Sequence, residues 1–237
     1  MNFDDLVKRD GVYYQKFLNI PFTGNVVGKI QGKMSKGKIE GEWIEYHGNG
    51  QLWRKRNFKD GKEEGEWICY YENGQLESKE NYKDGKKEGE WLHYHENGQL
   101  WIKQYYNDDK QEGEHLSYDK DGQLHHKWNY KDNKIEGEYL SYHGNGQLRD
   151  KRNYKDGKME GERLVYDQNG WLWIKYNYKD DKLEGELLHY HANGQVREKG
   201  NYKDDKQDGE YFYYRSNGQL KKTEIFKNGK LIKTITP

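Results

Sequence analysis

The chain has 237 residues, of which only 32% are hydrophobic and 35% are charged, a composition more typical of a disordered chain than of a globular core. Its 41 basic and 41 acidic side chains balance, which argues against nucleic acid or an anionic membrane as a partner. The 22 Tyr, 8 Trp and 6 Phe, however, return at fixed positions. We therefore expect an ordered chain without a single central core.

The first residues, MNFDDLVKRDGVYY, lack the apolar segment of an export signal, and no run of residues is apolar enough to span a membrane. The single cysteine, Cys69, excludes an intramolecular disulfide and fits a reducing compartment. These features predict a cytoplasmic protein without a strong membrane signal. A removed export signal would leave no trace in this sequence.

Residues 1–39 depart from the pattern of the remaining chain. They contain Pro21-Phe22-Thr23-Gly24 and then Lys36-Gly37-Lys38, which is similar to a loop that recurs later. We expect an N-terminal cap built on a degenerate repeat, because open arrays must cover an exposed strand edge. Residues 233–237 are expected to form a C-terminal tail.

From residue 40 to residue 232 the sequence repeats every 24 residues without insertion or deletion. A Gly-Glu pair and an Asn-Gly or Asp-Gly pair keep step through all eight units. The glycines of the first pair are Gly41, Gly65, Gly89, Gly113, Gly137, Gly161, Gly185 and Gly209, and those of the second are Gly50, Gly74, Gly98, Gly122, Gly146, Gly170, Gly194 and Gly218. Such a period marks a repeat array in which each unit contacts its neighbours.

Each unit predicts one β-hairpin, since residues 40–62 hold two stretches rich in Trp, Tyr and Ile, separated by GNG and KDG. A three-residue GNG loop with Gly50 in the left-handed region would place Tyr46 opposite Leu52. We expect three residues in the KDG loop as well, because its third position is always Gly, Asn or Asp. Even-numbered and odd-numbered residues would then take opposite faces of the sheet.

The even-numbered face is expected to form the structural core. Its most regular apolar positions include Tyr46, Leu52, Ile68, Tyr70, Leu92, Tyr94, Leu140, Tyr142, Leu188 and Tyr190. A flat sheet would leave this stripe in water, so the sheet should twist or curl. The predicted fold class is all-β: an elongated, open-ended, single-layer antiparallel meander of about eight 24-residue β-hairpins.

The odd-numbered face varies from unit to unit and carries most of the tryptophans. Aromatic rings on such a face are candidate contacts for a protein partner or for the apolar face of a sugar. The candidates are Trp43, Trp53, Trp67, Trp91, His93, His95, Trp101, His115, Trp171, Trp173, His189 and His191. An alternative is that they form cross-strand pairs that stabilise a thin sheet, with Trp53 opposite Trp67.

The sequence offers little chemistry for catalysis or metal binding. His93 and His95 form a His-x-His pair, but no Cys or carboxylate joins them at a ligand spacing. The acidic turns, such as Asp108-Asp109, lack the alternating ligands of a calcium loop. No nucleophile, phosphate-loop or metalloprotease motif is present. We therefore predict no enzymatic activity, no cofactor and no metal.

The motif GEWxxYxENGQLxxKxNYKDGK, nearly intact in residues 65–86, resembles the MORN repeat variant. The array is also similar to bacterial proteins classed as YwqK-family antitoxins. The resemblance covers most of the chain and implies a β-hairpin array. MORN-type arrays serve as scaffolds, as lipid-associated modules and as proposed antitoxin or immunity partners of toxins, so the resemblance implies function only loosely.

Three functional hypotheses follow. The first is a non-enzymatic antitoxin or immunity-type scaffold that binds a protein partner, such as a toxin, through its variable Trp and His residues. The second is a carbohydrate-binding module in which Trp53, Trp67, Trp101 and Trp173 stack against sugars. The third, association with membrane lipid, is disfavoured by the balanced charge. The oligomeric state stays open.

Overall fold

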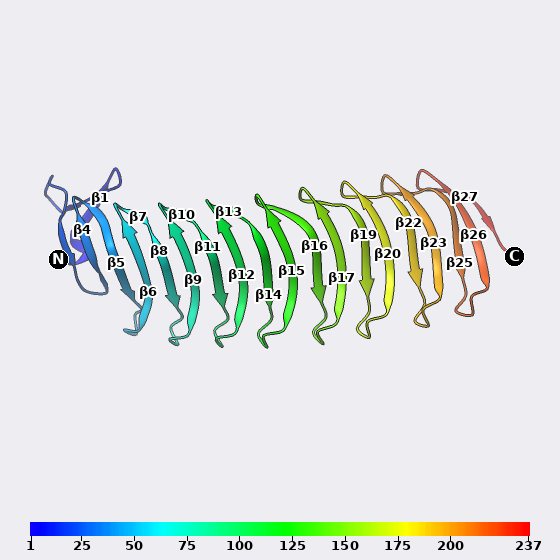
Figure 1. Cartoon of the computed structure of the whole chain (residues 1–237), viewed down its shortest axis with the longest axis horizontal. Coiled ribbons are helices and arrows are strands. Elements are labelled where there is room, and N and C mark those ends of the chain that lie inside the picture. Colours follow the sequence, from blue (N-terminus) through cyan, green and yellow to red (C-terminus); the bar gives the residue numbers. More distant parts are fainter. The chain divides into compact units, whose positions relative to one another are not determined.

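The computed structural model describes residues 1–237. The chain is nearly all β and has no α-helix, and its strands form an antiparallel meander of hairpins (Figure 1). It divides into two compact units, one of residues 1–113 and 117–122 and the other of residues 114–116 and 123–237.

The first unit begins with a short 3₁₀ helix and continues as strands. Its elements are η1 (Phe3–Asp5), β1 (Leu6–Arg9), β2 (Val12–Gln15), β3 (Gly24–Val26), β4 (Ile30–Ser35), β5 (Lys38–Tyr46), β6 (Leu52–Lys59), β7 (Lys62–Glu63), β8 (Gly65–Tyr70), β9 (Leu76–Lys83), β10 (Lys86–Lys87), β11 (Gly89–Tyr94), β12 (Leu100–Asn107) and β13 (Lys110–Gln111). The next strand, β14 (Gly113–Tyr118), contributes residues to both units.

The second unit consists of strands and loops only. Its further strands are β15 (Leu124–Lys131), β16 (Lys134–Tyr142), β17 (Leu148–Lys155), β18 (Lys158–Met159), β19 (Gly161–Tyr166), β20 (Leu172–Lys179), β21 (Lys182–Leu183), β22 (Gly185–Tyr190), β23 (Val196–Lys203), β24 (Lys206–Gln207), β25 (Gly209–Tyr214), β26 (Leu220–Lys227) and β27 (Lys230–Ile235). In both units, consecutive long strands lie side by side (Figure 1).

The meander does not close into a barrel. Strand β27 pairs with β26, and β3 pairs with β4. The only branching of the strand order is local, since a long strand such as β9 pairs with both the short β10 and the following β11. The open-ended all-β meander predicted from the period is therefore confirmed.

The GNG loop has the predicted conformation. Tyr46 pairs with Leu52, and Gly50 takes a φ of +86°, in the left-handed region that glycine tolerates best. The Gly50 amide donates to the His47 carbonyl at 3.0 Å, and the Asn49 side-chain oxygen accepts from the Gln51 amide at 2.9 Å. The three-residue loop with a G1 bulge is therefore confirmed.

The KDG loop is shorter than predicted. Lys59 pairs directly with Lys62, and the two residues between them, Asp60 and Gly61, have φ angles of +51° and +81°. Two successive left-handed residues are typical of a type I′ turn, for which Asp-Gly is a favoured sequence. The expectation of a three-residue KDG loop is wrong, and this turn exchanges even and odd positions between the faces.

A second exchange of parity occurs just after the GNG loop. The pairing passes from Tyr46–Leu52 to Glu45–Arg54, so that β6 holds one extra residue. The Arg54 guanidinium lies 4.1 Å from the Trp53 ring, which places these consecutive side chains on one side of the sheet. The two exchanges cancel over one repeat, and every repeat therefore presents the same two faces.

We name the two faces by their residues in the first complete repeat. The packed face carries Trp43, Glu45, Arg54, Arg56, Phe58 and their equivalents 24 residues apart. The ladder face carries Glu42, Ile44, Tyr46, Leu52, Lys55 and their equivalents. Both sets follow from the observed register and from the alternation of side chains along a strand.

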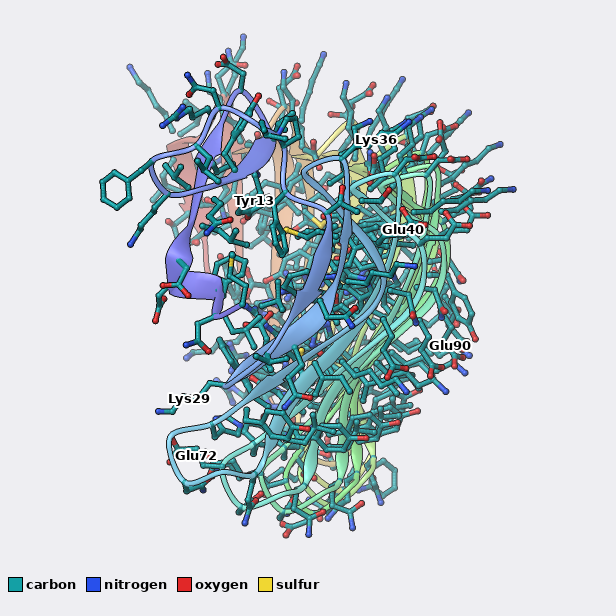
Figure 2. All side chains as sticks on the ribbon, turned by 90° about the vertical axis from the view of Figure 1, so that its left-hand side faces the viewer. Tyr13, Lys29, Lys36, Glu40, Glu72 and Glu90 are labelled. Carbon is teal, nitrogen blue, oxygen red and sulfur yellow. The ribbon has the colours of Figure 1, made fainter.

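The largest buried side chains of the repeats lie on the packed face. Trp43, Trp91 and Tyr211 are buried there, and in the first unit Phe3 and Leu6 of the N-terminal segment pack over Trp43. Figure 2 shows Tyr13, which belongs to the same cluster, on one side of the strands and Glu90 projecting from the other side. The N-terminal segment therefore covers part of the packed face.

This arrangement corrects the predicted core. The expected core residues share one face, the ladder face, but none of them is fully buried: Tyr46, Leu52, Ile68, Tyr70, Leu92, Tyr94, Leu140, Tyr142, Leu188 and Tyr190 are all partly exposed. The ladder face also carries a row of solvent-exposed ion pairs, such as Lys55–Glu42 at 2.5 Å and Lys79–Glu66 at 2.6 Å. Such pairs contribute little stability.

Candidate functional site

The GNG loops form one edge of each unit, which we call the loop edge (Figure 1). It comprises residues 47–51, 71–75, 95–99, 119–123, 143–147, 167–171, 191–195 and 215–219, together with residues 53, 77, 101, 125, 149, 173, 197 and 221 at the start of the following strands. Consecutive loops of this edge are joined by two recurrent side-chain hydrogen bonds. We call these bonds the loop ties.

The first loop tie occurs in five loops and starts at the first residue of the loop. Its side chain donates to the backbone carbonyl of the tyrosine that precedes the next loop. The bonds are His47 to Tyr70 at 2.7 Å, Tyr71 to Tyr94 at 2.6 Å, His95 to Tyr118 at 3.2 Å, His143 to Tyr166 at 3.0 Å and His191 to Tyr214 at 3.0 Å. A carbonyl only accepts, so each of these imidazoles carries a proton on Nε2.

The second loop tie starts at the loop asparagine, whose side-chain amide donates to a carbonyl of the next loop. The bonds are Asn49 to Glu72 at 3.0 Å, Asn73 to Glu96 at 3.0 Å, Asn97 to Lys120 at 2.7 Å, Asn145 to Gln168 at 2.7 Å and Asn193 to Ser216 at 2.6 Å. The two ties hold neighbouring loops in fixed relation, so side chains on this edge are presented by an ordered backbone.

The acidic turns at the opposite edge have an equivalent role. The carboxylates of Asp109, Asp181 and Asp205 each accept from a backbone amide of the preceding repeat at 2.8 Å. These residues replace the glycine of the type I′ turn and keep its left-handed conformation. A structural role therefore accounts for the acidic pairs without a bound cation.

Three of the candidate tryptophans are structural. Trp43, Trp67 and Trp91 lie on the packed face, and each indole nitrogen donates to a backbone carbonyl at 3.1 to 3.3 Å. Trp43 and Trp91 are buried and cannot contact a partner directly. The expected Trp53–Trp67 pair is also absent, because Arg54 pairs with Cys69 and Trp67 packs on Phe58 instead.

The candidate histidines are not gathered into one site. His95 and His191 form loop ties, and His189 lies 3.2 Å from Glu198. Burial lowers the pKa of His93, and it lowers the pKa of His115 to about 4. His115 is buried and stacks on Trp128 with ring centroids 4.0 Å apart, so it belongs to the packed face and not to a binding surface.

The remaining candidates lie in the open, at the loop edge. The exposed fractions are 37% for Trp53, 46% for Trp101, 58% for Trp171 and 50% for Trp173. Two of these indoles lie near the loop-tie histidine of their own repeat, with ring centroids 5.8 Å apart for His47–Trp53 and 5.6 Å apart for His95–Trp101. Trp53, Trp101 and Trp173 therefore expose an aromatic surface at the same place in the repeat, and Trp171 adds a second exposed indole two residues before Trp173.

Each exposed tryptophan lines an open cleft between consecutive loops. The Trp53 cleft has a volume of about 450 Å³ and includes Glu72, Glu77 and Glu96. The Trp101 cleft has a volume of about 540 Å³ and includes Glu96 and Lys120. The clefts share an architecture and differ in charge, because the loop-edge residues change from repeat to repeat.

Two clefts in the second unit contain residues that the sequence reasoning missed. One cleft holds Trp171 and Trp173 together with Asp167. Its neighbour is basic and is lined by His191, Arg197, Tyr213, Tyr214, Arg215, Lys221 and Lys222. The available signal was positional, since Arg197 and Lys221 occupy the repeat position of Trp53 and Trp101.

Variation on the packed face is largely explained by packing. Asp150 accepts from Arg152 at 3.0 Å and from Arg163 at 2.6 Å. Burial opposes the charge of this carboxylate, but the hydrogen bonds from both guanidinium groups outweigh burial and hold the pKa of Asp150 below its usual value. Similarly, Gly200 leaves room for the ring of Tyr211. The loop edge, and not a whole face, is therefore the candidate site.

The structure contains no group of three or more His, Cys, Asp or Glu side chains arranged to hold a metal ion. No helix in the structure has the length and apolar character needed to cross a membrane.

Tandem β-hairpins joined by ties between equivalent positions define a repeat scaffold. The sequence matches the MORN repeat variant over eight segments, residues 39–60, 63–84, 87–108, 111–132, 135–156, 159–180, 183–204 and 207–228. The chain belongs to this family.

Among solved structures, the chain is similar to parts of much larger proteins. The similarity to TcdB2-TccC3-Cdc42 has 14% identity and a TM-score of 0.21, and that to TcdB2-TccC3 has 13% identity and a TM-score of 0.22. Each alignment covers 80% of this chain and 14% of the other chain. Similarities this distant carry no argument about function. No curated protein matches the sequence.

Proposed function

We propose that this protein is a non-enzymatic scaffold of the antitoxin or immunity type, which binds a protein partner through the exposed tryptophans of its loop edge. The observation that carries the proposal is the placement of Trp53, Trp101, Trp171 and Trp173. All four are exposed at the loop edge, whereas the sheet itself is held by other residues. Tryptophan on a rigid surface is the residue type most often found at the energetic centre of protein interfaces.

Within each repeat, the residues that hold the loops differ from the residues that line the clefts, which supports a binding role. The loop ties recur while the residues beside them change, so one backbone presents a different set of side chains in each cleft. A partner with a matching sequence of apolar and charged groups would be recognised by several clefts together. Binding energy of this kind requires no reactive group.

The test is binding to, and neutralisation of, the protein encoded beside this one in its genome. We expect the two proteins to co-purify. Trp101→Ala should weaken the complex by at least about 30-fold, the loss typical of a hot-spot aromatic residue.

Lys59→Ala provides the matched control, because Lys59 is an exposed residue next to the opposite edge of the sheet. It should leave affinity unchanged. Both variants should keep the wild-type melting temperature. The proposal fails if the neighbour neither binds nor is neutralised, or if Lys59→Ala weakens binding as much as Trp101→Ala.

A further inference from the structure

The loop ties are interrupted once within the second unit, at residues 167–171. Asp167 stands where a histidine or tyrosine forms the first tie, and a carboxylate cannot donate to a carbonyl. It instead accepts from the amides of Asn169 at 2.9 Å and of Trp171 at 3.0 Å. The Asn169 side chain donates back to Asp167 at 3.5 Å and makes no bond to the next loop. Both ties to residues 191–195 are therefore missing.

A third contact between the same two loops is missing as well. In other repeats the glutamine that follows the loop glycine lies against the glycine of the next loop, as Gln147 does at Gly170 and Gln195 does at Gly218. Trp171 replaces this glutamine, and open space surrounds Gly194 on the side where a side chain would project. Between the same two loops lies the cleft of about 450 Å³ that Trp171, Trp173 and Tyr190 line.

The basic cleft continues directly from this aromatic cleft, because His191 and Arg197 line both. It has a volume of about 420 Å³, and no carboxylate is among its lining residues. Lys222 is neutralised by Glu224 at 2.5 Å, but Arg197, Arg215 and Lys221 form no ion pair. Three unpaired cations therefore converge on one depression of a chain whose net charge is zero.

We propose that the two adjoining clefts form one binding site for an anionic saccharide. A sugar ring would lie against the exposed indoles of Trp171 and Trp173, and a sulfate or carboxylate substituent would reach Arg197, Arg215 and Lys221. A guanidinium group can donate two parallel N–H hydrogen bonds to two oxygen atoms of such an oxyanion. Both clefts are needed for this site. The tryptophan rings alone would not distinguish a charged sugar from a neutral one, and the exposed cations alone would bind an anion only weakly.

The same residues disfavour a nucleic acid or an acidic peptide. Hydrogen bonds from the Trp171 and Asn169 amides lower the pKa of Asp167, so its carboxylate is charged beside the indoles. This charge repels a phosphodiester backbone but can accept hydrogen bonds from sugar hydroxyls. An extended peptide binds by pairing with free backbone groups. Near the basic cleft, the Ser216 carbonyl already accepts from the Asn193 side chain and is not free for such pairing.

Calorimetric titration of the full chain tests the proposal. The probes are a sulfated heparin disaccharide, the neutral disaccharide cellobiose, a thymidine oligonucleotide and an oligoglutamate peptide. We expect the sulfated disaccharide to bind with a dissociation constant of about 1 mM or tighter, and cellobiose at least roughly tenfold more weakly. Trp173→Ala and the double variant Arg215→Gln with Lys221→Gln should each weaken binding by about tenfold.

Two variants serve as matched controls. Trp53→Ala removes an exposed indole from a cleft lined by glutamates, and Lys227→Gln removes an exposed cation away from both clefts. Both should bind the sulfated disaccharide like the wild type. Circular dichroism and the melting temperature show that each variant is folded.

The proposal is overturned if the sulfated disaccharide does not bind, or if cellobiose binds equally well. It is also overturned if the oligonucleotide or the peptide binds more tightly, or if Trp53→Ala causes the same loss as Trp173→Ala. The proposed protein interaction is independent of this result, because it is measured with Trp101→Ala and the neighbouring gene product.

Discussion

Gly200 offers a sharp test of how the packed face is built. It lies on β23 directly opposite Leu187 and beneath the ring of Tyr211 in β25. A Cβ atom at Gly200 would meet ring carbons of Tyr211 at 2.3 to 2.5 Å. Favourable carbon contacts lie at about 3.5 to 4.0 Å, so the Gly200→Ala substitution forces one of the two groups to move.

Tyr211 has little freedom to move aside. Its side chain is fully buried, its hydroxyl donates to the Asn201 carbonyl at 2.7 Å, and its ring packs edge-on against Phe226 with centroids 5.0 Å apart. Overpacking of a well-ordered site costs about 1 to 3 kcal/mol. We expect Gly200→Ala to reach the upper part of this range, because displacing Tyr211 also strains its hydrogen bond.

The measurement is thermal unfolding followed by circular dichroism, with hydrogen exchange of β23 and β25 to localise the loss. Tyr211→Leu should rescue Gly200→Ala, since Leu187 in β22 occupies the equivalent position one repeat earlier. Gly144→Ala is the matched control, because no atom lies within 4 Å of its Cβ position. A neutral Gly200→Ala, or a double variant no more stable than the single one, would refute the packing argument.

Three further outcomes are expected. The pKa of His115 is about 4 in the folded chain and about 6.5 in the unfolded chain. As the pH falls, the unfolded chain therefore binds the proton first, and the free energy of unfolding decreases by up to about 3 kcal/mol between pH 6.5 and 4. His115→Leu should flatten the melting temperature over that window. Asp150→Asn should lower the free energy of unfolding by about 2 to 3 kcal/mol, because it leaves two half-buried arginines without their carboxylate partner. Urea unfolding measures this loss, and an unchanged midpoint would contradict the prediction. His143→Phe removes one loop tie, so amides of residues 167–171 should exchange faster with a loss of about 1 kcal/mol, whereas unaltered exchange would show the tie to be unimportant.

The turn chemistry determined how far the sequence could predict the fold. Gly50 after Gly48-Asn49 specifies a three-residue loop, and the structure has that loop. Asp60-Gly61 fits either a two-residue turn or the end of a longer loop, and an uninterrupted alternation of even and odd residues between the faces predicts the longer loop. The turn at Asp60-Gly61 has one residue fewer than predicted, and β6 has one extra residue beside Trp53. Each of these changes moves the even-numbered side chains to the other face of the sheet, so odd and even residue numbers alone do not identify the faces.

The candidate site was only partly predictable for the same reason. Exposed Trp53 and buried Trp43 are both odd-numbered tryptophans near one hairpin, and only the bulge separates their environments. The basic cleft was hidden because its cations come from two strands and one loop, and because the overall charge of the chain is zero. Comparing equivalent repeat positions would have indicated Arg197 and Lys221, but not that they converge.

The loop ties also limit how the length of this protein can change. Each tie joins residues 23 positions apart, and each carboxylate bond of the acidic turns joins residues 22 positions apart. Excision or duplication of one complete 24-residue unit restores both sets of partners, whereas any other change leaves a carbonyl or an amide unsatisfied. Descendants of this gene should therefore lengthen or shorten in steps of whole hairpins, and each step would add or delete one cleft.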